Sequence, residues 1–188
     1  MPTFGSLKLC CVAVVSLMGL GSSAYSQDKL LRRELSVEWT QAKADSAGAE
    51  ERDENLAGFK KRYAGEIAAT RLPVLVPNSA AVNSELRLAS QGSNYVVESK
   101  LEAAVLTLFG NITALGSSEN QIMSNAASGC KDRFEPADDG MDLNFCKYNA
   151  AYVLRLTCDD IEDSRCRKED FLNRVKQGLL VAGGEKLQ

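Results

Sequence analysis

Cysteine is the residue of this chain whose type and spacing most clearly predict chemistry. Six cysteines are present, and four of them lie close together in the last third of the sequence: Cys130, Cys146, Cys158 and Cys166. No Cys-x-x-Cys pair occurs among them, so neither a redox-active dithiol nor a zinc site is expected. An even set of cysteines in an exported chain instead predicts a framework of structural disulfides.

The favoured disulfide pairing joins neighbours along the chain. Cys158 ends a predicted strand and Cys166 precedes the predicted C-terminal helix, so a bridge between them would tie that helix to the sheet. Cys130 would then pair with Cys146. The main alternative joins Cys146 to Cys158 across the two arms of one predicted hairpin. Each bridge is expected to contribute about 2–4 kcal/mol to stability.

Carboxylates gather in two predicted loops, which makes them the next candidates for chemistry. One group surrounds Gly140 and the other lies between the last two cysteines, and the candidates for weak binding among them are Asp138, Asp139 and Asp160. Oxygen-rich loops of this kind can bind Ca²⁺. When Gly140 is aligned with the turn glycine of a calcium loop, however, Cys146 takes the final ligand position, so no metal site is expected. A pair of the same carboxylates could serve a hydrolase as acid and base.

The chain contains no histidine, which excludes Ser-His-Asp and Cys-His catalysis and any metal centre that needs imidazole. One serine motif, Ser128-Gly129-Cys130-Lys131, matches the Ser-x-x-Lys pattern, but its third residue is a cysteine expected to be bridged. Neither a Gly-x-Ser-x-Gly elbow nor a glycine-rich phosphate loop is present. We therefore favour a non-enzymatic protein and expect no catalytic residue and no cofactor.

Residues 1–26 are predicted to be a secretory signal peptide. Lys8 is followed by an apolar run, Leu9–Leu20, that is shorter than the roughly 20 residues a membrane-spanning helix needs. Ala24-Tyr25-Ser26 then supplies the small residues of a cleavage site. Export to a periplasm is the favoured localisation, with secretion from the cell as the alternative. No transmembrane segment is expected in the mature chain, and cleavage removes Cys10, Cys11 and one positive charge.

Residues 27–54 are interpreted as a polar extension, helical or flexible. Leu31, Leu35 and Trp39 recur at spacings of four, which is typical of one helical face. Thr40–Glu54 contains no large apolar residue, and its pattern leaves a linker and a solvated helix equally open. A helix is predicted next, because its apolar residues follow helical spacing: Leu56, Phe59, Tyr63 and Ile67.

Residues 55–188 are predicted to form a single α+β domain with a mainly antiparallel sheet and a C-terminal helix. The expected strands are an edge strand at 72–77, a hairpin at 85–99, a central strand at 103–109 covered on both faces, and a hairpin at 141–158. The last hairpin turns at Tyr148-Asn149, which places Cys146 opposite Ala151. The C-terminal helix is expected over residues 168–177.

The tip of the last hairpin is a candidate recognition patch, because Tyr148 and Asn149 would be exposed there and tyrosine is frequent in binding hot spots. The 22 basic and 25 acidic side chains balance closely, so no nucleic-acid footprint is expected. Taken together, these features predict an exported, non-enzymatic envelope protein that binds an envelope protein or polymer or plays a structural role. The alternatives are a periplasmic hydrolase that uses carboxylates and a secreted inhibitor or effector.

Overall fold

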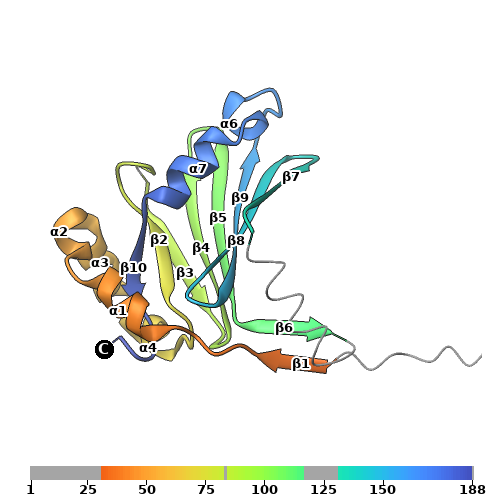
Figure 1. Ribbon diagram of the computed structural model, residues 1–188. Helices are drawn as coiled ribbons and strands as arrows, with labels where there is room; N and C mark the ends of the chain where they lie inside the picture. Colours follow the sequence, from red (N-terminus) through yellow and green to blue (C-terminus); the bar gives the residue numbers. More distant parts are fainter. Residues whose placement is uncertain (1–30, 83, 117–130, 188) are drawn as a thin grey trace, which may run out of the picture.

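The largest element of the fold is a six-strand antiparallel sheet in the order β3-β4-β5-β9-β8-β7 (Figure 1). The computed structural model describes residues 31–82, 84–116 and 131–187. The strands of this sheet are β3 (Leu86–Ser90), β4 (Asn94–Leu101), β5 (Ala104–Asn111), β7 (Arg133–Ala137), β8 (Gly140–Lys147) and β9 (Ala150–Cys158). Every described strand pair is antiparallel, which confirms the predicted α+β class with a mainly antiparallel sheet.

Two smaller antiparallel pairs accompany the large sheet. In one of them, β2 (Val74–Pro77) pairs with β10 (Leu179–Gly183), about a hundred residues later in the chain. In the other, β1 (Leu31–Glu34) pairs with β6 (Thr113–Gly116) to form a ribbon that extends away from the rest of the fold (Figure 1). The prediction of a helical face through Leu31 is therefore wrong, because these four residues are held extended by their ladder with β6.

Short helices come before each strand of the β2–β10 pair in the sequence. Among the described residues, those between β1 and β2 are α1 (Trp39–Ser46), α2 (Ala49–Arg52), α3 (Glu54–Arg62) and α4 (Ala64–Ala69). Those between β9 and β10 are α6 (Ser164–Arg167) and α7 (Asp170–Gln177). The predicted C-terminal helix is confirmed in α7, which Gly178 caps, and the predicted apolar stripe runs through α3 and α4.

Two buried tyrosines connect the β2–β10 pair to the large sheet. The Tyr95 hydroxyl of β4 accepts a hydrogen bond of 2.7 Å from the amide of Leu75, and the Tyr152 hydroxyl of β9 donates one of 3.1 Å to the carbonyl of Pro73. Gly110 of β5 lies directly opposite Tyr95, and a Cβ at Gly110 would approach the tyrosine ring to 2.4 Å. The glycine therefore leaves the space that the ring occupies.

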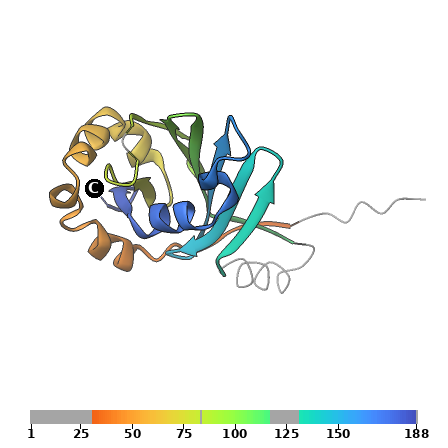
Figure 2. The same cartoon turned by 90° about the horizontal axis from the view of Figure 1, so that it is seen from above.

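Within the described residues, helices and the β2–β10 pair cover only one face of the large sheet (Figure 2). Along β5 the side chains of Ala104, Leu106 and Leu108 are at most 4% exposed, whereas Phe109 is 40% exposed. The prediction that this central strand is covered on both faces is wrong, because the helices and the β2–β10 pair lie on the same side of the sheet (Figure 2). We call the covered side the inner face and the other side the outer face.

The N-terminal helices contact the β2–β10 pair through small residues. Ala42 of α1 and Ala49 of α2 are buried, with 0% and 2% of their surface exposed. A Cβ at Gly184, just after β10, would lie 2.7 Å from the indole ring of Trp39, so this glycine admits the ring. Thr40–Glu54, for which the sequence leaves a linker and a solvated helix open, thus lies mainly in α1 and α2, whose buried alanines contribute to the core.

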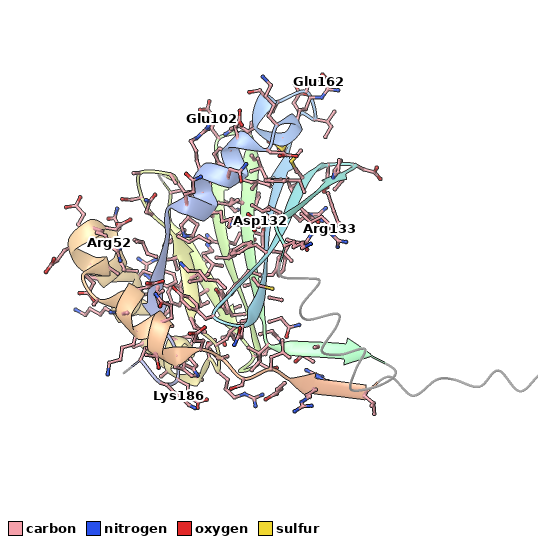
Figure 3. The ribbon with its side chains drawn as sticks, in the orientation of Figure 1. Arg52, Glu102, Asp132, Arg133, Glu162 and Lys186 are labelled. Atoms are coloured by element: carbon pink, nitrogen blue, oxygen red, sulfur yellow. A yellow bond between two sulfur atoms is a disulfide. The ribbon has the colours of Figure 1, made fainter. Side chains whose placement is uncertain are left out.

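The expected disulfide between Cys158 and Cys166 is present and ties α6 to the end of β9. Cys146 is also disulfide-bonded, and Cys130, its expected partner, lies outside the described residues, as does the predicted signal peptide. The Arg165 guanidinium donates to the carbonyl of Glu102 at 2.8 Å, which fixes α6 against the β4–β5 turn. Figure 3 shows Glu102 and Glu162 at this same end of the molecule.

Candidate functional site

The predicted recognition patch at the last hairpin has the expected turn but not the expected exposure. Cys146 pairs with Ala151 as predicted, and Tyr148 and Asn149 form the turn with φ values of 54° and 60°. Asn149 is exposed, but Tyr148 is only 5% exposed, so the prediction that both side chains are exposed is wrong. The cause is Asp45 of α1, whose carboxylate accepts a hydrogen bond of 2.5 Å from the Tyr148 hydroxyl.

The three predicted aspartates lie on exposed turns at one end of the large sheet. Asp138 and Asp139 form the β7–β8 turn, and Asp139 pairs with Arg155 at 2.7 Å. Asp160 follows β9, and its carboxylate accepts a hydrogen bond from the Glu162 amide. Within the described residues, no group of three or more potential ligand side chains is arranged to hold a metal ion.

Asp142 of β8 is the carboxylate whose surroundings are least favourable to its charge. Its Oδ2 atom lies 3.4 Å from the Arg155 guanidinium, while Oδ1 is buried and has no hydrogen-bond partner. Burial raises the pKa of Asp142; Arg155 opposes that shift, and the neighbouring Glu135 and Asp139 add to it. The sequence does not distinguish this residue from the other acids around Gly140.

The clearest concave site is a groove of about 470 Å³ between α3, the end of β2 and the start of β3. We call it the α3 groove. Its apolar lining comes from both sides of the gap and includes Leu56, Phe59, Val76, Val82 and Leu86. Four of these side chains are at most 7% exposed, and Leu86 is half-buried, so they form a fixed floor rather than a flexible surface.

Asp53 determines where the groove begins. Its side chain is 6% exposed and accepts the amide of Asn55 at 2.9 Å, which caps the first turn of α3. Its second oxygen accepts the amide of Ser79, so the segment after β2 is held against the helix end. Both carboxylate oxygens are thus bound to backbone donors, and Asp53 positions the two walls of the groove.

The rim of the groove carries more negative than positive charge. Arg62 at the end of α3 forms an exposed ion pair with Glu85 on the opposite wall. Asp53 and Glu54 also line the groove, so three carboxylates face one guanidinium. Gly58 lies between them on α3, and a Cβ at this position would meet no atom within 4 Å.

Comparison with known proteins leaves the site to be interpreted from its own chemistry. No protein-family model, curated protein or solved structure matches the chain. Among the described residues, no helix is both long enough and apolar enough to span a bilayer.

The sequence does not predict the α3 groove, because the residues of its two walls are separated along the chain. Glu85 follows Arg62 by 23 residues, and nothing in either local pattern indicates that they meet. One local signal was available: Gly58 interrupts an amphipathic helix at a position where glycine costs about 1 kcal/mol relative to alanine. A glycine inside a helix is typical of a position where another segment packs closely or where the helix surface is left open.

Proposed function

We propose that this protein is exported to the cell envelope and acts there as a non-enzymatic binding module whose ligand site is the α3 groove. The groove is the observation that carries the proposal. Its volume of about 470 Å³ lies within the range of roughly 300–1,000 Å³ that is usual for ligand sites. A half-open shape suits a ligand that keeps one side in water, as a segment of a larger partner does.

The lining of the groove selects the chemistry of that ligand. The apolar floor is mostly buried and offers a small contact to apolar groups, and the polar rim, which makes up most of the exposed lining, orients the ligand. Because three carboxylates and one guanidinium surround the floor, the groove favours a ligand that carries positive charge. We therefore propose a short polypeptide segment with apolar residues flanked by lysine or arginine.

Two of the three acids of the groove have structural tasks that leave them poorly suited to proton transfer. Asp53 is bound by two backbone amides, and Glu85 is paired with Arg62. The proposal therefore assigns no catalytic residue. It also assigns no ligand contact to Asp138, Asp139, Asp160, Tyr148 or Asn149, since none of them lines the groove.

Gly58 allows the groove to be blocked without removing any existing contact. Gly58→Leu places a side chain into open space above the floor and replaces glycine in a helix with a better helix former. Gly65→Leu is the matched control, because Gly65 lies in α4, is equally open and does not line the groove. Both variants should fold at least as stably as the unmodified protein.

The probes are fluorescently labelled hexapeptides with an apolar centre and either lysine or glutamate at both ends. We expect binding of the lysine-flanked peptides by the unmodified protein and by Gly65→Leu, and at least a tenfold weaker affinity for Gly58→Leu. Amide shift perturbations should map to residues 53–62 and 76–86. Equal affinity of the two glycine variants would refute the site.

Export is tested separately. Fusing residues 1–30 to a reporter enzyme that folds only in an oxidising compartment should give activity outside the cytoplasm, and replacing Leu9–Leu20 with polar residues should abolish it. A fusion that stays in the cytoplasm and shows no reporter activity would contradict the proposed localisation without affecting the binding proposal.

A further inference from the structure

We infer that two copies of this chain associate face to face through the outer face of the six-strand sheet, related by a two-fold axis that runs along β5. In the residues that the structure describes, α1–α4, α6 and α7 lie on the inner side (Figure 2). The outer face presents the alternate side chains of β3, β4, β5, β9 and β8, and it is distinct from the α3 groove.

One row of outer-face side chains carries charges in an order that is complementary to itself. The register places Arg87, Glu98, Thr107, Arg155 and Asp142 side by side on five adjacent strands. Thr107 lies on the central strand, with a basic and an acidic residue on each side. A half-turn about β5 brings Arg87 opposite the second copy's Asp142 and Glu98 opposite the second copy's Arg155, so opposite charges meet on these four strands. Glu135 of β7 continues the row past Asp142 and lies beyond the second copy's β3.

The neighbouring row is apolar at its centre and fits the same axis. It consists of Ala89, Val96, Phe109, Val153 and Asn144. Phe109, 40% exposed, lies on β5 and would meet its own counterpart in the second copy. Val96 would then contact the second copy's Val153. An isologous interface requires this kind of self-complementarity, with apolar groups at the centre and charged groups toward the rim.

The size of the face is close to what a stable dimer needs. Five strands spaced about 4.8 Å apart, four of them eight or nine residues long and β3 five, cover roughly 600 Å² at about 3.4 Å per residue. Specific interfaces bury about 800 Å² per partner on average, with a range of about 600–1,000 Å². Two stacked sheets also pack with their strands nearly aligned, which this axis provides.

Exchanging the charges of two neighbouring residues tests the dimer interface without disturbing the fold of the monomer. Arg87 and Glu98 are cross-strand neighbours, so the double variant Arg87→Glu/Glu98→Arg keeps one positive and one negative charge side by side in the monomer. Across the two-fold axis, however, the new side chains meet Asp142 and Arg155 of like charge. We expect the dissociation constant of the dimer to rise by at least about 100-fold, because like charges at an interface cost several kcal/mol.

Two further variants complete the test, which uses sedimentation velocity over roughly 1–200 µM of the purified protein. Phe109→Ser should also dissociate the dimer, since it removes the central apolar contact from a side chain that is already exposed. Lys61→Glu, on the exposed side of α3, is the charge-reversal control and should dimerise normally. The inference is overturned if the unmodified protein stays monomeric at the highest concentration, or if the exchanged variant, folded by circular dichroism, dimerises as tightly as the control.

Discussion

The hydroxyl of Tyr148, at the turn of the last hairpin, donates a hydrogen bond of 2.5 Å to the carboxylate of Asp45 in α1, 103 residues earlier in the chain. The bond lowers the pKa of Asp45, and burial together with the bond raises the pKa of Tyr148. Lys147 adds an ion pair with Asp45 at 3.6 Å. The N-terminal helices are thus fastened to the large sheet by a tertiary contact at the hairpin tip.

Removing the Tyr148 hydroxyl should loosen this contact. Tyr148→Phe keeps the buried ring but removes one of the donors to Asp45, leaving Gln41 and Lys147, and we expect a loss of about 1–2 kcal/mol in the free energy of unfolding. Urea denaturation measures the loss. Tyr63→Phe is the control, because the Tyr63 hydroxyl makes only a long bond of 3.4 Å and should cost much less. Equal losses for both variants would show that the Asp45 bond contributes nothing specific.

Asp142→Asn should stabilise the protein near neutral pH. Because the folded-state pKa of Asp142 is raised by burial, its ionised form is disfavoured on folding. The cost is absent below the unfolded pKa, grows as pH rises from the unfolded to the folded pKa, and is fully present above the folded pKa. The melting temperature of the variant should therefore exceed that of the unmodified protein at about pH 7 and converge with it near pH 3.

The measurement is a thermal melt at low micromolar concentration, where the monomer is observed. Asp139→Asn serves as the comparison, since this exposed carboxylate pairs with Arg155 and its removal should bring no gain at any pH. A lower melting temperature for Asp142→Asn at about pH 7 would contradict the prediction.

The Cys158–Cys166 disulfide should stabilise the fold by restricting the unfolded chain. It spans a sequence separation of 8 residues, for which loop-closure entropy predicts about 2–3 kcal/mol. The double variant Cys158→Ala/Cys166→Ala should lose that amount in a denaturant titration, more than any single change of an exposed charge. An unchanged unfolding midpoint would mean that α6 is held by other contacts, such as the bond from Arg165 to Glu102.

Gly110→Ala should be among the most damaging single-methyl additions in the sheet. The new Cβ would lie 2.4 Å from the ring of Tyr95, which is fully buried and cannot move away without breaking its bond to Leu75. We expect a loss of about 1–3 kcal/mol, the usual cost of overpacking a core. Gly58→Ala, in the open part of α3, should instead gain up to about 1 kcal/mol. Denaturant titration of the two variants provides the contrast.

The sequence predicts those parts of the fold that depend on local patterns. Alternation of apolar and polar residues locates β3, β4, β8 and β9, and the turn at Tyr148-Asn149 fixes the pairing of Cys146 with Ala151. The Cys158–Cys166 bridge follows from the order of strand, loop and helix. Each of these features is decided within about twenty residues of chain.

Features that depend on distant segments were not predicted. An apolar run such as β5 indicates a central strand, but whether one or both of its faces are covered depends on where the helices pack. The burial of Tyr148 requires Asp45, and the strand at Leu31–Glu34 requires β6. The α3 groove and the outer face likewise arise from residues brought together by topology rather than by spacing.

The pairing of β2 with β10 also determines when the fold can be completed. β10 follows its partner β2 by about a hundred residues. Until β10 has paired, Val74–Pro77 lacks its only ladder partner among the described residues, and the N-terminal helices lack the surface on which Ala42 and Ala49 are buried. The β2–β10 pair can therefore form only after all six strands of the large sheet have been synthesised, and a truncation that removes β10 should leave a persistently open, protease-sensitive intermediate.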